Sequence, residues 1–302
     1  MYQHILVPLD GSALAETTLD YARDIAGELG LSITVLHVYE FNEGAFVTMR
    51  EGYVRGIADT VRQQLSEQYG RGGTEQRGGR GEVQGKLAMG HAAEEILRYA
   101  DKNNVDLILM ATHGRSGIRR WAIGSVADKV VRATKKPVLL DRVKRTSPTQ
   151  NKIIVPLDGF KQSEAVVGCI ESLAAGLKSE VILLQVLEDF YLINTGGGRM
   201  VRVRYTDGRM VELEDGAKRY LDKIATLLRD KGIDAKSEVR IGDVPREIIK
   251  LADEGQARLV AMLKRRRSII SPLDLGSVAD KVLRRGTTPV MLFSAPGGGR
   301  KL

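Results

Sequence analysis

Two sequence patterns occur twice in this chain of 302 residues, in the same order and at nearly the same spacing. Residues 5–11 read ILVPLDG and residues 153–159 read IIVPLDG, while GSVADKV occurs unchanged at 124–130 and 276–282. The paired copies are 148 and 152 residues apart, so the two matches agree in register to within a short loop. Repetition at a fixed period indicates a duplicated structural unit. We therefore predict two copies of one domain, at residues 1–147 and 148–302.

Each copy alternates between predicted strands and predicted helices. Short apolar runs predict buried strands, and apolar residues at helical spacing predict the helices between them. In the first copy the predicted strands are 5–9, 33–38, 83–88, 107–111 and 138–140, and the predicted helices are 12–27, 53–69, 92–103 and 125–133. The second copy repeats this order from residue 153 through 181–186, 217–231, 235–241, 245–252, 259–263 and 290–293. The alternation predicts an α/β fold of two tandem, doubly wound, open parallel sheets, Rossmann-like, with strand order 3-2-1-4-5.

The strongest local motifs fall at one predicted edge of the first sheet. In open sheets of this kind, ligands bind beyond the carboxyl ends of the strands, where the strand order reverses. Asp10 follows the first predicted strand, and the segment from Ala111 to Gly114 follows its neighbour, the fourth. A helix begins at Gly124-Ser125, and unpaired N–H groups at a helix start suit a phosphate. Asp10 can accept hydrogen bonds from a ribose hydroxyl or a base amine. The pattern favours a nucleotide site; the alternative is that the glycines only form a turn and Ser125 only caps its helix.

These motifs carry a resemblance to a known family. VPLDGS at 7–12, VLHV at 35–38, THG at 112–114 and GSV at 124–126 resemble the universal stress protein family, and the resemblance covers nearly all of both halves. The family's nucleotide motif reads Gly, two residues, Gly, nine residues, Gly, and then Ser or Thr, which falls here on Ala111, Gly114, Gly124 and Ser125. Alanine thus replaces the first glycine and adds one methyl group that could crowd the ribose. The resemblance implies an adenine nucleotide alpha hydrolase-like form of the fold.

The resemblance also implies a ligand and the residues that bind it. The expected ligand is ATP, with or without Mg²⁺, with AMP or ADP as alternatives, and the expected role is regulation in the stress response. By resemblance, Asp10 and the backbone of Val38 hold the nucleoside, whereas the glycine motif and Val126 hold the phosphates. The complete predicted set is Pro8, Leu9, Asp10, Val38, Met110, Ala111, Gly114, Gly124, Ser125 and Val126.

The second copy departs further from the family motif. Arg266 occupies the position of Gly114, inside the basic run KRRR at 264–267, so a side chain replaces the close backbone approach. Three interpretations are open: an inactive site whose basic run is solvated or paired with acidic neighbours, an anion site made by arginine side chains, or a nucleic-acid patch. We favour the first and disfavour the last, because no aromatic residues interleave with the run. The tentative second set is Pro156, Asp158, Val186, Arg266, Gly276 and Ser277.

Charge and cysteine content restrict the possible partners and compartment. The net charge is +8, of which residues 1–150 carry +2 and residues 151–302 carry +6. Because the excess is concentrated in the diverged copy, we do not expect nucleic acid as a partner. The single cysteine, Cys169, excludes an intramolecular disulfide framework and a Cys-based zinc site. The first residues lack the pattern of a secretory signal, and no apolar run approaches the roughly 18 residues that span a bilayer. We expect a cytoplasmic protein with no membrane partner.

Two further features concern insertions and assembly. The segment 195–216 predicts a hairpin insertion, with strands at 200–205 and 209–213 around an Asp207-Gly208 turn. The fifth strands, within 137–140 and 289–293, would leave open sheet edges. In the family that the chain resembles, such edges pair to form dimers. We expect the tandem chain to pair them internally, with a homodimer as a further possibility.

The sequence offers no clear catalytic motif. We find no defensible Ser–His–Asp spacing and no Walker A lysine, and the four histidines show no metal-ligand spacing. We therefore expect a binding protein whose enzymatic activity is at most weak ATP hydrolysis. The alternatives are a slow Mg²⁺-dependent ATPase, with Asp10 and His113 aligning water, and a nucleotide-free scaffold whose sites are relics.

Overall fold

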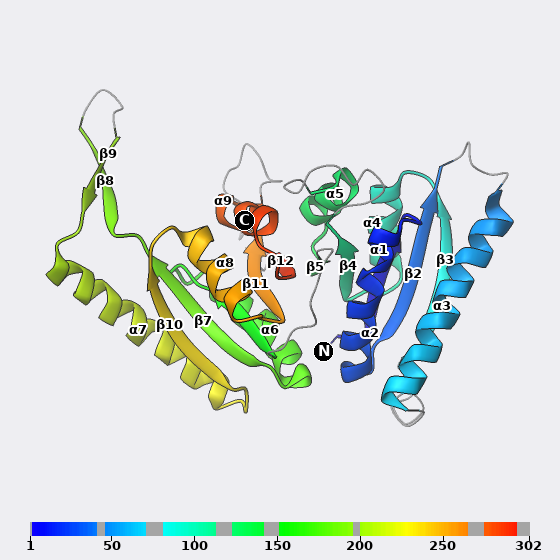
Figure 1. Cartoon of the computed structure of the whole chain (residues 1–302), viewed down its shortest axis with the longest axis horizontal. Coiled ribbons are helices and arrows are strands. Elements are labelled where there is room, and N and C mark those ends of the chain that lie inside the picture. Colours follow the sequence, from blue (N-terminus) through cyan, green and yellow to red (C-terminus); the bar gives the residue numbers. More distant parts are fainter. Residues whose placement is uncertain are drawn as a thin grey trace, which may run out of the picture. The chain divides into compact units, whose positions relative to one another are not determined.

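The computed structural model describes residues 2–40, 46–70, 81–112, 123–141, 151–195, 200–264 and 275–294. The chain divides into two compact units (Figure 1). The first comprises Met1–Ser147 with Leu263–Gly276 and Pro289–Leu302, and the second comprises Pro148–Met262 with Ser277–Thr288. The end of the second sequence copy thus belongs to the first unit. The predicted boundary between residues 147 and 148 lies outside the described residues.

The first unit contains a parallel sheet in the predicted order, β3-β2-β1-β4-β5. Its strands are β1 (His4–Leu9), β2 (Ser32–Tyr39), β3 (Val83–Met89), β4 (Leu107–Ala111) and β5 (Val138–Asp141). Its helices are α1 (Ala13–Glu16), α2 (Thr18–Leu29), α3 (Val47–Tyr69), α4 (Ala92–Lys102) and α5 (Ser125–Ala133). Helix α2 packs beside α3 and α4 beside α5, as in a doubly wound sheet. The fold class predicted from the sequence is confirmed, although the helix expected at 12–27 is divided into α1 and α2.

Aliphatic burial explains why β1 and β4 lie at the centre of this sheet. Ile5 and Leu6 of β1 are fully buried, and they pair with Leu107 and Ile108 of β4, which are also fully buried. A strand covered by helices on both faces reads as a continuous apolar run rather than an alternating one. The ILVPL and LILMA runs therefore fold into neighbouring central strands, and their carboxyl ends reach the same edge of the sheet.

Strand β12 (Val290–Ser294) extends the sheet of the first unit. It runs antiparallel to β5, with Met291 opposite Leu139 and Leu292 opposite Val138. All four of these side chains are fully buried. A strand encoded by the second sequence copy therefore covers an edge that β5 would otherwise expose.

The second unit has the related parallel order β10-β7-β6-β11. Its strands are β6 (Lys152–Pro156), β7 (Glu180–Leu187), β10 (Ala235–Ile241) and β11 (Leu259–Lys264), the last two residues of β11 being counted with the first unit. Its helices are α6 (Ala165–Leu177), α7 (Asp207–Arg229), α8 (Val244–Glu254) and α9 (Ser277–Arg285). Among the helices that the structure describes, none is both long and apolar enough to cross a membrane.

A hairpin is present, but it differs from the predicted one: the strand predicted at 200–205 is confirmed, whereas the Asp207-Gly208 turn and the strand at 209–213 are wrong. The paired strands are β8 (Phe190–Asn194) and β9 (Met200–Arg204), which stand clear of the sheet of their own unit (Figure 1). Residues 209–213 instead form the start of α7, because the Thr206 side chain accepts a hydrogen bond from the Arg209 N–H and caps the helix. Leu213 also continues the helical spacing of the buried Ala217 and Leu221. The short alternating run was therefore part of a longer helical pattern.

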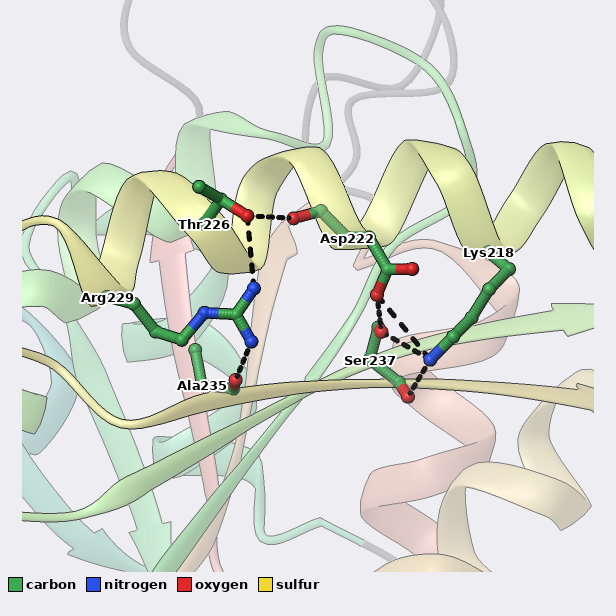
Figure 2. A network of polar contacts seen from close by, with 6 residues as sticks. All are labelled: Lys218, Asp222, Thr226, Arg229, Ala235 and Ser237. Atoms are coloured by element: carbon green, nitrogen blue, oxygen red, sulfur yellow. Dashed lines mark hydrogen bonds and ion pairs between the residues drawn. The ribbon is translucent and has the colours of Figure 1, made fainter.

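A polar network fastens α7 to β10 (Figure 2). The Lys218 ammonium donates to the backbone oxygen and the hydroxyl of Ser237, at 3.0 and 2.7 Å. The Ser237 hydroxyl donates in turn to the Asp222 carboxylate, which lowers the pKa of Asp222. About two turns further along α7, Arg229 donates to the Ala235 carbonyl at 3.3 Å. These contacts fix α7 along the outer strand of the second unit.

Candidate functional site

The first unit contains a partly open cavity of about 310 Å³ at the carboxyl ends of β1, β2 and β4 and at the start of α5. Nine of the ten residues in the predicted set line it: Pro8, Leu9, Asp10, Val38, Met110, Ala111, Gly124, Ser125 and Val126. The tenth, Gly114, lies outside the described residues. The structure therefore brings together residues that are more than 110 positions apart in the sequence, from Pro8 to Val126. Their contact with a nucleotide stays a prediction.

Sequence reasoning missed several residues that complete the wall. They are mostly small or aliphatic: Ala15, Leu36, Ala92, Ile96, Thr112 and Ala127. Thr112 lies inside the motif that follows the fourth strand and could have been included on that ground. The others come from helix faces and strand interiors, where apolar residues are normally assigned to the core. They make the wall apolar, as is common in pockets for small organic ligands.

A tight turn after β1 holds Asp10 at the cavity. Gly11 has φ of 80°, a left-handed conformation that glycine adopts without strain, and it ends the strand. Both the N–H and the hydroxyl of Ser12 donate to Oδ1 of Asp10, at 3.0 and 2.6 Å. The Ser12 hydroxyl oxygen in turn accepts from the Ala15 N–H at 3.2 Å, which caps α1. Among the described residues that line the cavity, Asp10 is the single ionisable one.

The start of α5 also lines the cavity. The Gly124 N–H donates to the Thr112 carbonyl at 2.7 Å, which ties the start of the helix to the end of β4. Gly124 is the N-cap residue and supplies no side-chain cap, so the first N–H groups of α5 are not satisfied by a capping side chain. The positive end of the helix dipole adds to their attraction for an anion. This geometry suits a phosphate.

A buried histidine is hydrogen-bonded to the backbone of a residue that lines the cavity. The His37 side chain is 3% exposed, and its Nδ1–H donates to the Leu9 carbonyl at 2.9 Å. Its Nε2 accepts a hydrogen bond from Arg50 at 2.8 Å, an arrangement that assigns a neutral ring protonated on Nδ1. The Tyr53 ring meets the imidazole edge-on, and its hydroxyl donates to Glu16 at 2.7 Å. The ends of β1 and β2 are thereby connected to α3.

The model of the universal stress protein family matches residues 1–142 and again residues 150–294. The chain belongs to the universal stress protein family. Universal stress protein MJ0531 of Methanocaldococcus jannaschii is 28% identical over 151 residues, which is 46% of this chain and 82% of that protein. A universal stress protein structure from Archaeoglobus fulgidus covers 97% of this chain and 96% of its own, with TM-score 0.64 and 17% identity. A universal stress protein solved in complex with cAMP covers 49% of this chain and 98% of its own, with TM-score 0.35 and 20% identity.

The structure describes five of the six residues that were predicted as a second set in this universal stress protein. Pro156 ends β6, Val186 lies in β7, and Asp158 is exposed and accepts a hydrogen bond from the Phe160 N–H at 3.0 Å. Gly276 is buried with φ of 83°, and Ser277 begins α9. Gly276 is counted with the first unit and the other four with the second, and Arg266 lies outside the described residues. The second site and its ligand therefore stay predictions.

Within the described ranges of this universal stress protein, no three or more His, Cys, Asp or Glu side chains gather as a metal site. His113, which the sequence suggested as a partner of Asp10 in hydrolysis, lies outside those ranges.

Proposed function

We propose that this protein binds ATP in the cavity of its first unit and acts as a nucleotide-dependent regulatory protein of the stress response. The observation that carries the proposal is the gathering of nine predicted nucleotide residues around one cavity of about 310 Å³. In the sequence, these residues stand at the ends of predicted strands and in the motifs that resemble the family.

The cavity lining combines the kinds of group that a nucleotide needs: a carboxylate, apolar side chains and the start of a helix. Asp10 supplies a carboxylate that can accept hydrogen bonds from a ribose or a base amine. The wall formed by Leu36, Ile96 and Met110 is apolar and suits the faces of a base. Ser125 and Val126, which also line the cavity, lie in the first turn of α5, where N–H groups and the helix dipole favour phosphate.

Paired variants of the two copies test both the ligand and its location. Asp10→Asn keeps an oxygen that can accept from Ser12 but removes the negative charge, and Asp158→Asn is the matched change in the second copy. Titration calorimetry with ATP should show binding to the wild type and to Asp158→Asn, and binding at least about tenfold weaker to Asp10→Asn, because a hydrogen bond to a charged group is lost. Equal affinity in all three proteins would place the nucleotide elsewhere, and no binding to the wild type would overturn the proposal.

The identity of the nucleotide is part of the same experiment. Titrations with AMP, ADP and ATP, each with and without Mg²⁺, rank the ligands, and we expect ATP to bind most tightly because α5 offers its amides to the phosphates. Phosphate release measured on the same samples tests the alternative of a slow ATPase. Binding of any of these nucleotides at the cavity contradicts the alternative of a scaffold with relic sites.

We further propose that pairing of the fifth strands joins the two sequence copies within one chain. The antiparallel register between β5 and β12 supports this inference. Sedimentation velocity of the full chain, with and without ATP, tests whether chains also form homodimers. A cytoplasmic location belongs to this proposal and rests on the sequence.

A further inference from the structure

The carboxyl end of α5 is held by a lysine that comes from the second sequence copy. The Lys264 ammonium donates to the carbonyl of Val131 at 3.1 Å and to that of Thr134 at 2.9 Å. The Lys264 side chain is buried, although lysine is almost never fully buried without partners. The hydroxyl of Ser294, at the end of β12, donates to the same Thr134 carbonyl at 3.3 Å. All of these residues are counted in the first unit.

This contact gives the first residue of the basic run a definite role. Lys264 comes directly after LVAML at 259–263, and Thr112 comes directly after LILMA at 107–111, so the two residues occupy corresponding positions in the two copies. Thr112 lines the cavity, and its carbonyl accepts from the start of α5. Lys264 instead contacts carbonyls at the end of the same helix. The Lys264 ammonium therefore donates to backbone oxygens of the protein and not to a phosphate.

The physical effect of Lys264 reaches the cavity through a short, rigid helix. Helix α5 has 9 residues, and its first three, Ser125, Val126 and Ala127, line the cavity. The last carbonyls of a helix lack intrahelical partners and carry the negative end of the dipole, so a buried cation there satisfies them and stabilises the helix. Because α5 is tied to Thr112 at its start and to Lys264 at its end, both ends of the helix are fixed.

We propose that Lys264 is a positioning residue for the phosphate end of the nucleotide site, supplied by the second sequence copy to a site formed by the first. This inference rests on the proposed function. It gives a physical reason for a lysine at the position where the first copy has Thr112: the residue supports α5 rather than a second ligand.

The test compares Lys264→Met with Lys281→Met, which removes the same charge from an exposed position on α9. Affinities for ATP and for adenosine are measured by calorimetry on the full chain. We expect Lys264→Met to bind ATP about tenfold more weakly, because groups that hold a ligand-binding element in place typically contribute an effect of this size. We expect the same variant to bind adenosine as the wild type does. Lys281→Met should match the wild type for both ligands, and Lys264→Arg, which keeps a cationic donor, should recover part of the ATP affinity.

Two outcomes in the Lys264→Met protein overturn the inference while leaving the proposed function of the wild type intact. One is unchanged ATP affinity in a destabilised Lys264→Met protein, and the other is an equal loss for ATP and adenosine, which indicates general loosening of the fold. If Lys264→Met does not fold, Ser294→Ala removes the weaker bond to the same carbonyl, and it should lower ATP affinity more than adenosine affinity. An equal effect of Ser294→Ala on both ligands overturns the inference.

Amide hydrogen exchange separates this inference from the proposed function. Without nucleotide, the α5 amides should exchange faster in Lys264→Met than in the wild type, because the end of the helix has lost its support. If the wild type binds no nucleotide, the proposed function fails and the positioning role fails with it. If the wild type binds ATP and the exchange of α5 is unchanged in Lys264→Met, only the positioning role fails.

Discussion

Arg50 on α3 donates a hydrogen bond at 2.8 Å to Nε2 of His37 on β2. The other ring nitrogen of His37 donates to the carbonyl of Leu9, a residue that lines the cavity. A single neutral imidazole therefore connects a helix, a strand end and the candidate site.

Removing this imidazole should destabilise the first unit. His37→Ala leaves the Leu9 carbonyl and Arg50 without their bonds to a buried ring, and we expect a loss of about 2–3 kcal/mol in the free energy of unfolding. His37→Gln should lose less, because an amide retains one donor and one acceptor, and Gln185 occupies the corresponding position of the second copy. Urea unfolding measures both variants, and equal losses would argue against the role of the two hydrogen bonds.

Filling the cavity should abolish ligand binding without harming the fold. Ala111 lines the cavity, and the corresponding residue of the second copy is Leu263. Ala111→Leu projects three more carbon atoms into the space, so ATP affinity should fall at least about tenfold, whereas thermal stability should hold or rise because apolar surface is buried. Calorimetry and thermal unfolding are the two measurements. Unchanged ATP affinity would show that the nucleotide does not enter this cavity.

Tyr220 on α7 should make the stability of the second unit sensitive to alkaline pH. Burial, and after it the charge of Glu164, raises the pKa of Tyr220 to about 12. Because the pKa is raised in the folded state, the protonated phenol favours folding below about pH 10, the unfolded value, and this contribution is lost as pH rises toward 12. The free energy of unfolding should therefore fall more steeply in the wild type than in Tyr220→Phe as the pH rises from about 9.5 to about 11, a range that begins just below the unfolded pKa of Tyr220. Parallel pH profiles of the two proteins would contradict the assignment.

The Thr206 cap should stabilise the first turn of α7, the segment whose sequence alternates like a strand. Thr206→Ala removes the acceptor for the Arg209 N–H and should lower the free energy of unfolding by about 1 kcal/mol, while Thr206→Ser should retain most of it. Hydrogen exchange of the amides at 207–210 locates the effect. Equal exchange in all three proteins would mean that the cap does not fix the start of the helix.

The sequence predicted most of the fold and of the candidate site because both depend on local patterns. The buried runs at Ile5 and Leu107 identify the central parallel strands, and strands of that kind end at one edge of the sheet. Asp10 and Ala111 therefore had to lie near each other. Ala15 and Ile96 could not be assigned to the cavity, because an apolar residue on a helix face shows the same pattern whether it meets a ligand or a neighbouring side chain.

The hairpin illustrates a limit of short windows. The run from Arg209 to Leu213 alternates like a strand when it is taken alone, but the cap at Thr206 and the spacing from Leu213 to Leu221 belong to a helix. Tertiary packing of the apolar face against the sheet selects the helix, since most helical stability comes from such packing.

The amino-acid sequence by itself determined the duplication, the order of strands in the first sheet and the residues that meet at its switch point. The pairing of β12 with β5 was expected from the sequence, because both fifth strands would otherwise leave open sheet edges. Only the tertiary structure decided that Lys264 contacts α5, since Lys264 and Thr134 are 130 residues apart and no local pattern relates them. The physical reason is that hydrophobic periodicity shows which face of a helix or strand is buried, but not which element packs against it. That partner depends on the backbone groups that still lack a hydrogen bond once the rest of the chain has folded. The basic run shows the difference most clearly: the sequence left three interpretations of it open, whereas the structure shows its first lysine donating to carbonyls at the end of a helix.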